Sequence, residues 1–246
     1  MKLLKNLGQY YLLMAKVFSR PEKSRIFLKR ILQEIEQLGL NSIGIVVIIS
    51  FFMGAVITLQ TAYNFESPII PRYLIGLTAR DTMMLEFSST IVGLILAGKV
   101  GSNIASEIGT MRVTEQIDAL EIMGVNPANY LILPKIIAAV FFNPFLNIIS
   151  IFVGIVGGYL ISVFTDAVTV HDYIQGLHAF FYPFYITYSL VKTVVFAFII
   201  TSVSSYYGFF TKGGALEVGR SSTKAVVYSS VIILLFNLIL TQLLLA

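Results

Sequence analysis

Long apolar runs separated by short polar segments dominate the chain. Most of them reach the roughly 20 residues that a helix needs to cross a bilayer core of about 30 Å, at a rise of about 1.5 Å per residue. The pattern therefore predicts an all-α integral membrane protein with five transmembrane helices. The predicted spans are residues 43–63, 83–100, 130–164, 184–206 and 225–246.

The third apolar run is too long for one straight crossing. Pro134 and Pro144 lie inside it, and a proline within a helix removes a backbone hydrogen bond, so we expect kinks there. Gly154 and Gly158 are four residues apart in the same run. Such a pair of small residues lets a neighbouring helix approach closely in a membrane.

The first 40 residues differ from the rest of the chain. They mix lysine and arginine with leucine and tyrosine, and they lack the apolar stretch and cleavage site of a secretory signal. Residues 22–39 place Leu28, Ile31 and Ile35 on one helical face with bases elsewhere, which is typical of a helix lying in the membrane interface. A cytosolic helix packed on a partner is the alternative. We therefore divide the chain into an N-terminal amphipathic segment, 1–40, and a membrane domain, 41–246.

The distribution of basic residues predicts the orientation. Lysine and arginine gather in the N-terminal segment, in residues 98–135 and in residues 212–224, whereas residues 165–183 form a predicted loop with two aspartates and no base. Cytoplasmic segments of membrane proteins are enriched in these bases. The N-terminus and the polar segment after the second span are therefore predicted to be cytoplasmic, and five crossings put the C-terminus on the other side.

Composition agrees with a membrane protein and narrows its chemistry. The 246 residues are 57% hydrophobic and 12% charged, about half the charged fraction of a soluble domain. There are no cysteines, so neither disulfides nor thiol chemistry is available. The net charge of +4 gives no sign of nucleic-acid binding, because most bases precede the first span, where anionic lipid headgroups are the natural partner.

A polar segment between the second and third spans is the most distinctive part of the sequence. Its middle, about residues 107–124, reads as one short amphipathic helix with an apolar ridge and acids on the other faces. Thr114 is a candidate cap for a turn beginning at Glu115, and Gly124 followed by Pro127 is a stop signal. The segment is either a solvated helical loop or a docking element for a soluble partner.

The same segment resembles a known family. GSNIASEIGTMRVTEQIDALEIMGVNP, residues 101–127, is similar to the signature of the MlaE/YrbE permeases, the membrane subunits of ABC-type lipid transporters that work with MCE-domain proteins. SLVKTVVFA at 189–197 resembles the fourth span of that family. Blocks within 207–227 resemble the loop that enters its last span. The resemblance runs from about Leu40 to the C-terminus.

The resemblance implies a function that composition alone does not. It implies a permease that moves phospholipid between the bacterial inner membrane and a periplasmic MCE protein, helping to maintain outer-membrane lipid asymmetry. The partners would be a cytoplasmic ABC ATPase, the MCE protein, a second copy of the chain and a small STAS-type accessory protein. The segment at 107–124 would be the coupling helix on the ATPase. The coupling residues would be Glu107, Met111, Thr114, Glu115, Asp118, Leu120 and Met123.

Besides Lys99 and Lys135, which count with the cytoplasmic bases, two charged residues lie inside predicted spans. A charge at the centre of a helical span costs roughly 2.5–3.5 kcal/mol on insertion scales, so Glu86 and Lys192 need a partner or a polar cavity. They either pair with each other or line a path for lipid headgroups. Glu86 aligns with the acid of an Arg-Glu-Leu-Gly-Pro block of the family, but here the stretch from residue 85 reads Leu-Glu-Phe-Ser-Ser.

Enzymatic chemistry has no support in the sequence. No Walker A motif is present, so ATP hydrolysis is expected in a separate subunit. His171 and His178 lack the spacing of metal ligands, and no serine-hydrolase motif occurs. We expect no catalytic residue, metal or cofactor. A proton-linked secondary transporter that uses Glu86 and Lys192, and a membrane-embedded lipid enzyme, are the alternative functions.

Overall fold

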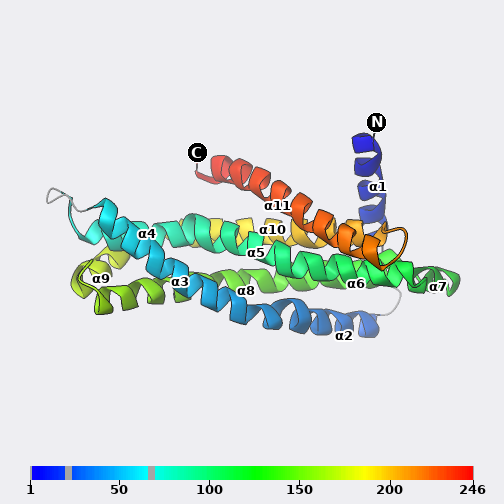
Figure 1. Ribbon diagram of the computed structural model, residues 1–246, viewed down its shortest axis with the longest axis horizontal. Helices are drawn as coiled ribbons and strands as arrows, with labels where there is room; N and C mark the ends of the chain where they lie inside the picture. Colours follow the sequence, from blue (N-terminus) through cyan, green and yellow to red (C-terminus); the bar gives the residue numbers. More distant parts are fainter. Residues whose placement is uncertain (1, 20–23, 66–69, 246) are drawn as a thin grey trace. The chain divides into compact units, whose positions relative to one another are not determined.

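A computed structural model describes residues 2–19, 24–65 and 70–245 (Figure 1). Residues 20–23, which the sequence placed in the N-terminal amphipathic segment, lie outside these ranges. Every regular element in the described residues is helical. The elements are α1 Lys2–Val17, α2 Ser24–Glu34, η1 Ile35–Leu40, α3 Asn41–Asn64, α4 Tyr73–Thr82, η2 Met83–Ile91, α5 Val92–Leu96, η3 Ala97–Gly101, α6 Ser102–Val113, α7 Gln116–Ile122, α8 Pro127–Phe164, α9 Val170–His178, α10 Phe184–Phe209 and α11 Ala215–Leu245, with η denoting π-helical turns.

Five helical runs in the described residues are long and apolar enough to cross a membrane, which confirms the predicted fold class. Consecutive elements join end to end within two of these runs. The first contains most of α2, η1 and α3, and the second extends from α4 to α6. The runs are Phe27–Asn64, Tyr73–Val113, Pro127–Phe164, Phe184–Phe209 and Ala215–Leu245.

The helices extend beyond the predicted spans. The second helical run begins at Tyr73, ten residues before the predicted start, and α11 begins at Ala215, ten residues before the predicted fifth span. Hydropathy marks where apolar residues are concentrated, whereas a helix continues for as long as its backbone hydrogen bonds do. The third run, α8, remains one helix through both Pro134 and Pro144.

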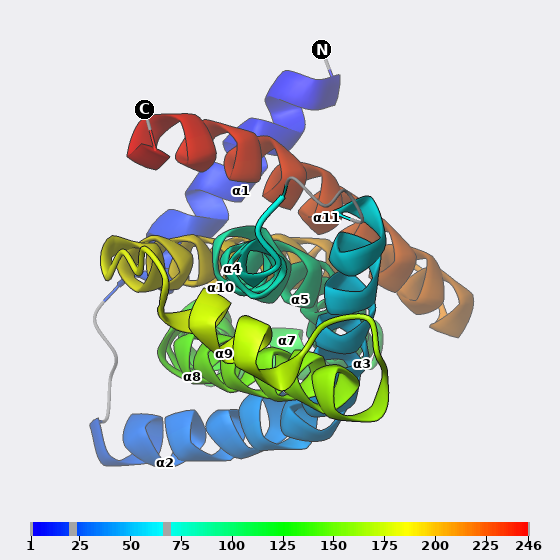
Figure 2. The same ribbon diagram turned by 90° about the vertical axis from the view of Figure 1, so that its left-hand side faces the viewer.

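The predicted loop at 165–183 contains a helix, α9, so that prediction was wrong for its middle part. Thr169 caps α9 by accepting a hydrogen bond from the backbone of Asp172 (3.1 Å). α9 lies beside α4 (Figures 1 and 2). Gly76 and Gly176 face the backbone of the opposite helix there, and a Cβ on either would collide with it. His171 and His178 therefore belong to a packed helix rather than to a loop.

The chain forms two compact units. Unit 1 comprises residues 1–41, 94–143 and 194–246, and unit 2 comprises 42–93 and 144–193. In unit 2, α3 and α8 approach so closely that a Cβ on Gly54 would meet the backbone of Gly154, as expected for small residues. A chain of buried hydroxyls adds polar contacts there. Ser50 donates to Ser150 (2.7 Å), which donates to Ser88 (3.1 Å).

Unit 1 contains α6 beside the first half of α11 (Figure 1). In the same unit, the end of α1 is attached to the start of α8. Asn129 donates to the backbone oxygens of Val17 (2.7 Å) and Ser19 (2.6 Å). Asn126 caps α8 through Ala128 (3.1 Å) and donates to the backbone oxygen of Lys16 (3.0 Å). These bonds satisfy carbonyls at the α1 terminus that the helix itself leaves without partners.

Candidate functional site

Unit 2 brings Glu86 and Lys192 together. The Lys192 ammonium donates to the Glu86 carboxylate at 3.0 Å, to the Leu85 backbone oxygen at 3.2 Å and to the Tyr188 hydroxyl at 3.0 Å. These three bonds match the three donors of a lysine side chain. The structure therefore contains the ion pair that was one of the two sequence-based alternatives.

The two ends of this pair differ in exposure. The Lys192 side chain is completely buried within the chain, whereas 44% of the Glu86 side chain is exposed. Glu86 lies in the π-helical η2, a wider turn of a kind that often occurs at functional sites. Thr90 donates to its second oxygen at 3.1 Å. The accessible polar group of the pair is therefore the carboxylate and not the ammonium.

Tyr188 completes this site, and sequence reasoning missed it. It is fully buried, its hydroxyl lies 3.4 Å from the Glu86 carboxylate, and the Lys192 ammonium lies 4.7 Å from the centre of its ring. The contact combines a hydrogen bond with a cation–π interaction. The spacing of four residues between Tyr188 and Lys192 places both on one helical face and could have indicated it.

The predicted helix at 107–124 is two helices, α6 and α7, which lie in unit 1. They are separated at Glu115, which has a left-handed φ of 60° that non-glycine residues seldom adopt. The Thr114 cap was also wrong. Its hydroxyl donates to the Thr110 backbone oxygen (2.8 Å) and accepts from Gln116 (3.0 Å), and the α7 start has no side-chain cap. A periodic apolar pattern continues across such a break, which hid it from the sequence.

The far end of α7 was predicted correctly. Gly124 has a φ of 79°, and the backbone N–H groups of Gly124 and Val125 donate to Glu121 and Leu120, which closes the helix as a Schellman motif. Just before this end, Ile122 is 87% exposed and Met123 is 67% exposed. Ile122 was absent from the predicted coupling residues, although it adjoins Met123. Two large apolar side chains are thus presented together at the tip of a short helix.

The other predicted coupling residues fall into three environments. Glu115 and Thr114 are exposed at the break, and Met111 and Leu120 are half-buried. Asp118 accepts a hydrogen bond from Arg112 at 2.6 Å, so part of the acidic rim is already paired within the chain. Glu107 accepts from the buried Lys135 at 2.8 Å. The exposed surface of α7 is accordingly more apolar than the sequence indicated.

Comparison with known proteins places this arrangement in a family. The family described as "Permease MlaE" matches residues 31–243. The chain belongs to the MlaE permease family. A probable ABC transporter permease of Rickettsia felis is 36% identical over 98% of this chain and 93% of its own length. One from Synechocystis is 34% identical over 95% of this chain and 88% of its own length.

A plant relative extends the comparison. The chloroplast protein TRIGALACTOSYLDIACYLGLYCEROL 1 of Arabidopsis thaliana is 34% identical over 89% of this chain and 63% of its own length. The part of this chain that matches the MlaE family includes both the Glu86–Lys192 pair and the α6–α7 turn. This MlaE-family chain is a multi-pass membrane protein and a permease subunit of the ABC transporter type.

Proposed function

We propose that this permease moves phospholipid between the inner membrane and a periplasmic MCE-domain protein, using a separate cytoplasmic ATPase. The observation that supports a docked ATPase best is the apolar tip of α7, where Ile122 and Met123 stand exposed outside the candidate spans. Exposed apolar side chains with a polar rim are typical of a protein-binding surface. A lipid cargo is supported by the Arabidopsis relative, which is named after a galactolipid.

The proposed mechanism is a coupled movement of helices. ATP closes the ATPase dimer, α7 moves with the surface on which it is docked, and the spans rearrange around a lipid path between two copies of the chain. A homodimer is supported by α11, because most of its apolar length is not buried within the single chain. A STAS-type accessory protein would bind on the cytoplasmic side.

Glu86 and Lys192 are proposed to line that lipid path. The exposed edge of Glu86 faces the path and needs water or a headgroup beside it, because an ionised carboxylate is poorly tolerated in hydrocarbon. Lys192, on the buried side of Glu86, partly neutralises the carboxylate charge. A headgroup that carries an N–H or O–H donor would then donate to the Glu86 carboxylate, while the fatty acyl chains contact the surrounding apolar side chains.

The test is reconstitution of the permease with its ATPase and MCE partner in proteoliposomes containing a fluorescent phospholipid. We expect lipid transfer to the MCE protein that requires ATP hydrolysis and stops with a Walker-motif variant of the ATPase. Transfer that needs no ATPase and collapses with an uncoupler would instead establish a proton-linked transporter, for which the Glu86–Lys192 pair would be the natural proton site. Lipid turnover by the purified chain alone would establish an enzyme.

The proposed orientation gives a separate prediction. With the N-terminus in the cytoplasm, the α10–α11 connection is cytoplasmic and α9 is periplasmic. Lys212 and Gln175 are exposed in these two places, and the chain has no cysteine of its own. In intact cells with a permeabilised outer membrane, Gln175→Cys should react with an impermeant thiol reagent and Lys212→Cys should not. The reverse labelling pattern would show that the chain is inserted the other way round.

A further inference from the structure

Unit 1 contains a buried charge cluster that the sequence did not reveal. Lys135 on α8 is 1% exposed and donates to two carboxylates at once, to Glu34 at 2.7 Å and to Glu107 at 2.8 Å. Glu34 is the last residue of α2, and Glu107 is in α6. One ammonium therefore connects the amphipathic N-terminal helix, the first part of α8 and the helix that leads to α7. We call these three residues the Lys135 cluster.

Other contacts hold α2 and η1 along α8 on both sides of Glu34. The Arg30 guanidinium lies 3.6 Å from the centre of the Tyr130 ring and donates to its backbone oxygen at 3.2 Å. On the other side, Gly39 lies against the Phe142 ring, where a Cβ would not fit. The α2–α8 contact is thus supported independently of Lys135. In contrast, the described ion pairs link α2 to α6 only because Glu34 and Glu107 both pair with Lys135.

The cluster is sensitive to small displacements. The second oxygen of Glu34 is buried and has no hydrogen-bond partner among the described residues. Its carboxylate consequently depends on Lys135, and a buried charge that loses its partner is strongly unfavourable. A shift of α6 that moves Glu107 must carry Lys135 with it or break one of the two short bonds. Either event changes the surroundings of Glu34.

We infer that Lys135 is a positioning residue that couples the position of α6, and with it the docking helix α7, to α2. The inference rests on the proposed function, because it gives α2 a role in the ATP-driven movement. When the ATPase displaces α7 and α6, the shared ammonium transmits the displacement to α2 and so to the first span, which continues from α2 through η1. The helix α2 then takes part in transport rather than serving only as an anchor.

The test measures the α2–α6 distance directly, by spin labels at Lys29→Cys and Thr110→Cys. Both positions are exposed and the chain has no other cysteine. The parent should give one narrow distance distribution. Lys135→Met should broaden it, and it should lower the melting temperature by roughly 5–10 °C because the largely buried Glu34 carboxylate and the partly exposed Glu107 carboxylate both lose their partner.

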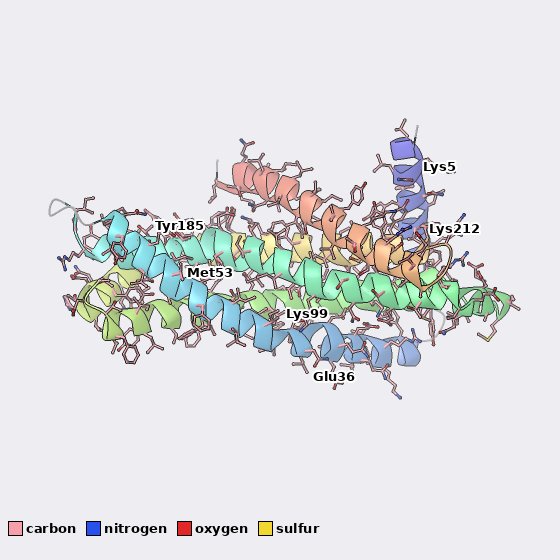
Figure 3. The ribbon with its side chains drawn as sticks, in the orientation of Figure 1. Lys5, Glu36, Met53, Lys99, Tyr185 and Lys212 are labelled. Carbon is pink, nitrogen blue, oxygen red and sulfur yellow. The ribbon has the colours of Figure 1, made fainter. Side chains whose placement is uncertain are left out.

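A neutral triple variant separates positioning from simple stability. Replacing all three charges, as Glu34→Gln, Glu107→Gln and Lys135→Met, leaves no uncompensated ion, and such replacements are often close to neutral for stability. We expect this variant to fold and to show the broadened distribution. The permease should also stimulate the ATP hydrolysis rate of its ATPase about fivefold less or weaker still, and fivefold is the lower end of the usual range for coupling between sites. Glu36→Gln, an exposed acid two residues away on η1 (Figure 3), is the matched control and should behave as the parent.

Two results would overturn the inference. One is a triple variant with the narrow distribution of the parent, and the other is a triple variant with broadened distances and undiminished ATPase stimulation. If the parent permease itself never alters the rate of the ATPase, the proposed function fails. The distance measurement requires no ATPase, so it would still decide whether Lys135 sets the position of α2 relative to α6.

Discussion

Glu86→Gln is expected to lower the free energy of unfolding by about 3–5 kcal/mol, and clearly more than Lys192→Met does. The reason is the unequal burial of the pair. Without the carboxylate, the charge of the fully buried Lys192 ammonium is left uncompensated. Without the ammonium, Glu86 keeps its Thr90 hydrogen bond, and 44% of its side chain is exposed. If that edge faces a hydrated lipid path, Lys192→Met should cost only about 1–2 kcal/mol.

The same variants separate stability from transport. Lys192→Met is expected to fold, yet to lose most ATP-driven phospholipid transfer, because Glu86 in the path would then bear an unneutralised charge. Chemical denaturation in detergent micelles gives the stability differences, and the reconstituted transfer assay gives the activity. Tyr182→Phe is the control, since it removes one exposed tyrosine hydroxyl outside the site without changing any charge.

Two outcomes would contradict this account of the pair. If Lys192→Met destabilises the protein as much as Glu86→Gln, the exposed edge of Glu86 does not face water. If Lys192→Met folds and transports lipid normally, the pair has no part in the lipid path. If the double variant, Glu86→Gln with Lys192→Met, also recovers stability, the pair is a purely structural ion pair between η2 and α10.

Ile122→Ala combined with Met123→Ala should weaken binding of the ATPase at least tenfold while leaving the permease folded. Fully burying one such side chain in an interface is worth roughly 1.5–3 kcal/mol, and both are exposed in the free chain, so their removal costs little stability. Binding is measured by titrating labelled ATPase onto the permease in nanodiscs. Phe164→Ala is the control, because it removes a similarly exposed side chain from the last residue of α8, the end far from α7.

Charge reversal nearby gives a contrasting result. Glu115→Lys with Asp118→Lys should weaken binding less at high salt than at low salt, because rim charges act mainly through long-range attraction. Asp118→Lys also places a like charge beside Arg112. If the apolar double variant binds the ATPase as tightly as the parent does, α7 is not the docking helix.

The amino-acid sequence by itself determined the class of protein. Apolar runs of nearly bilayer length predict membrane helices because a backbone in hydrocarbon must satisfy its own hydrogen bonds, and all five runs are helices in the structure. The stop at Gly124 was also readable, because only a residue tolerant of positive φ closes a helix in this way. The motif at 101–127 indicated the family that the comparison established.

Local pattern failed where the backbone changes direction without a change of polarity. The break at Glu115 interrupts α6 and α7 while the apolar spacing continues, and α9 lies inside a segment that looked like a loop. Helical packing explains α9, because two facing glycines let it rest against the backbone of α4. Such an approach depends on a partner about one hundred residues away, which a local pattern does not contain.

Tertiary structure alone decided which charges meet. The sequence identified Glu86 and Lys192 as residues that need compensation, but pairing and cavity lining both stayed open until their helices were placed side by side. Lys135 gave no signal at all, since it lies near the polar edge of an apolar run, where a lysine can ordinarily reach water. Its burial between Glu34 and Glu107 arises because three helices converge on it, and sequence spacing does not encode that convergence.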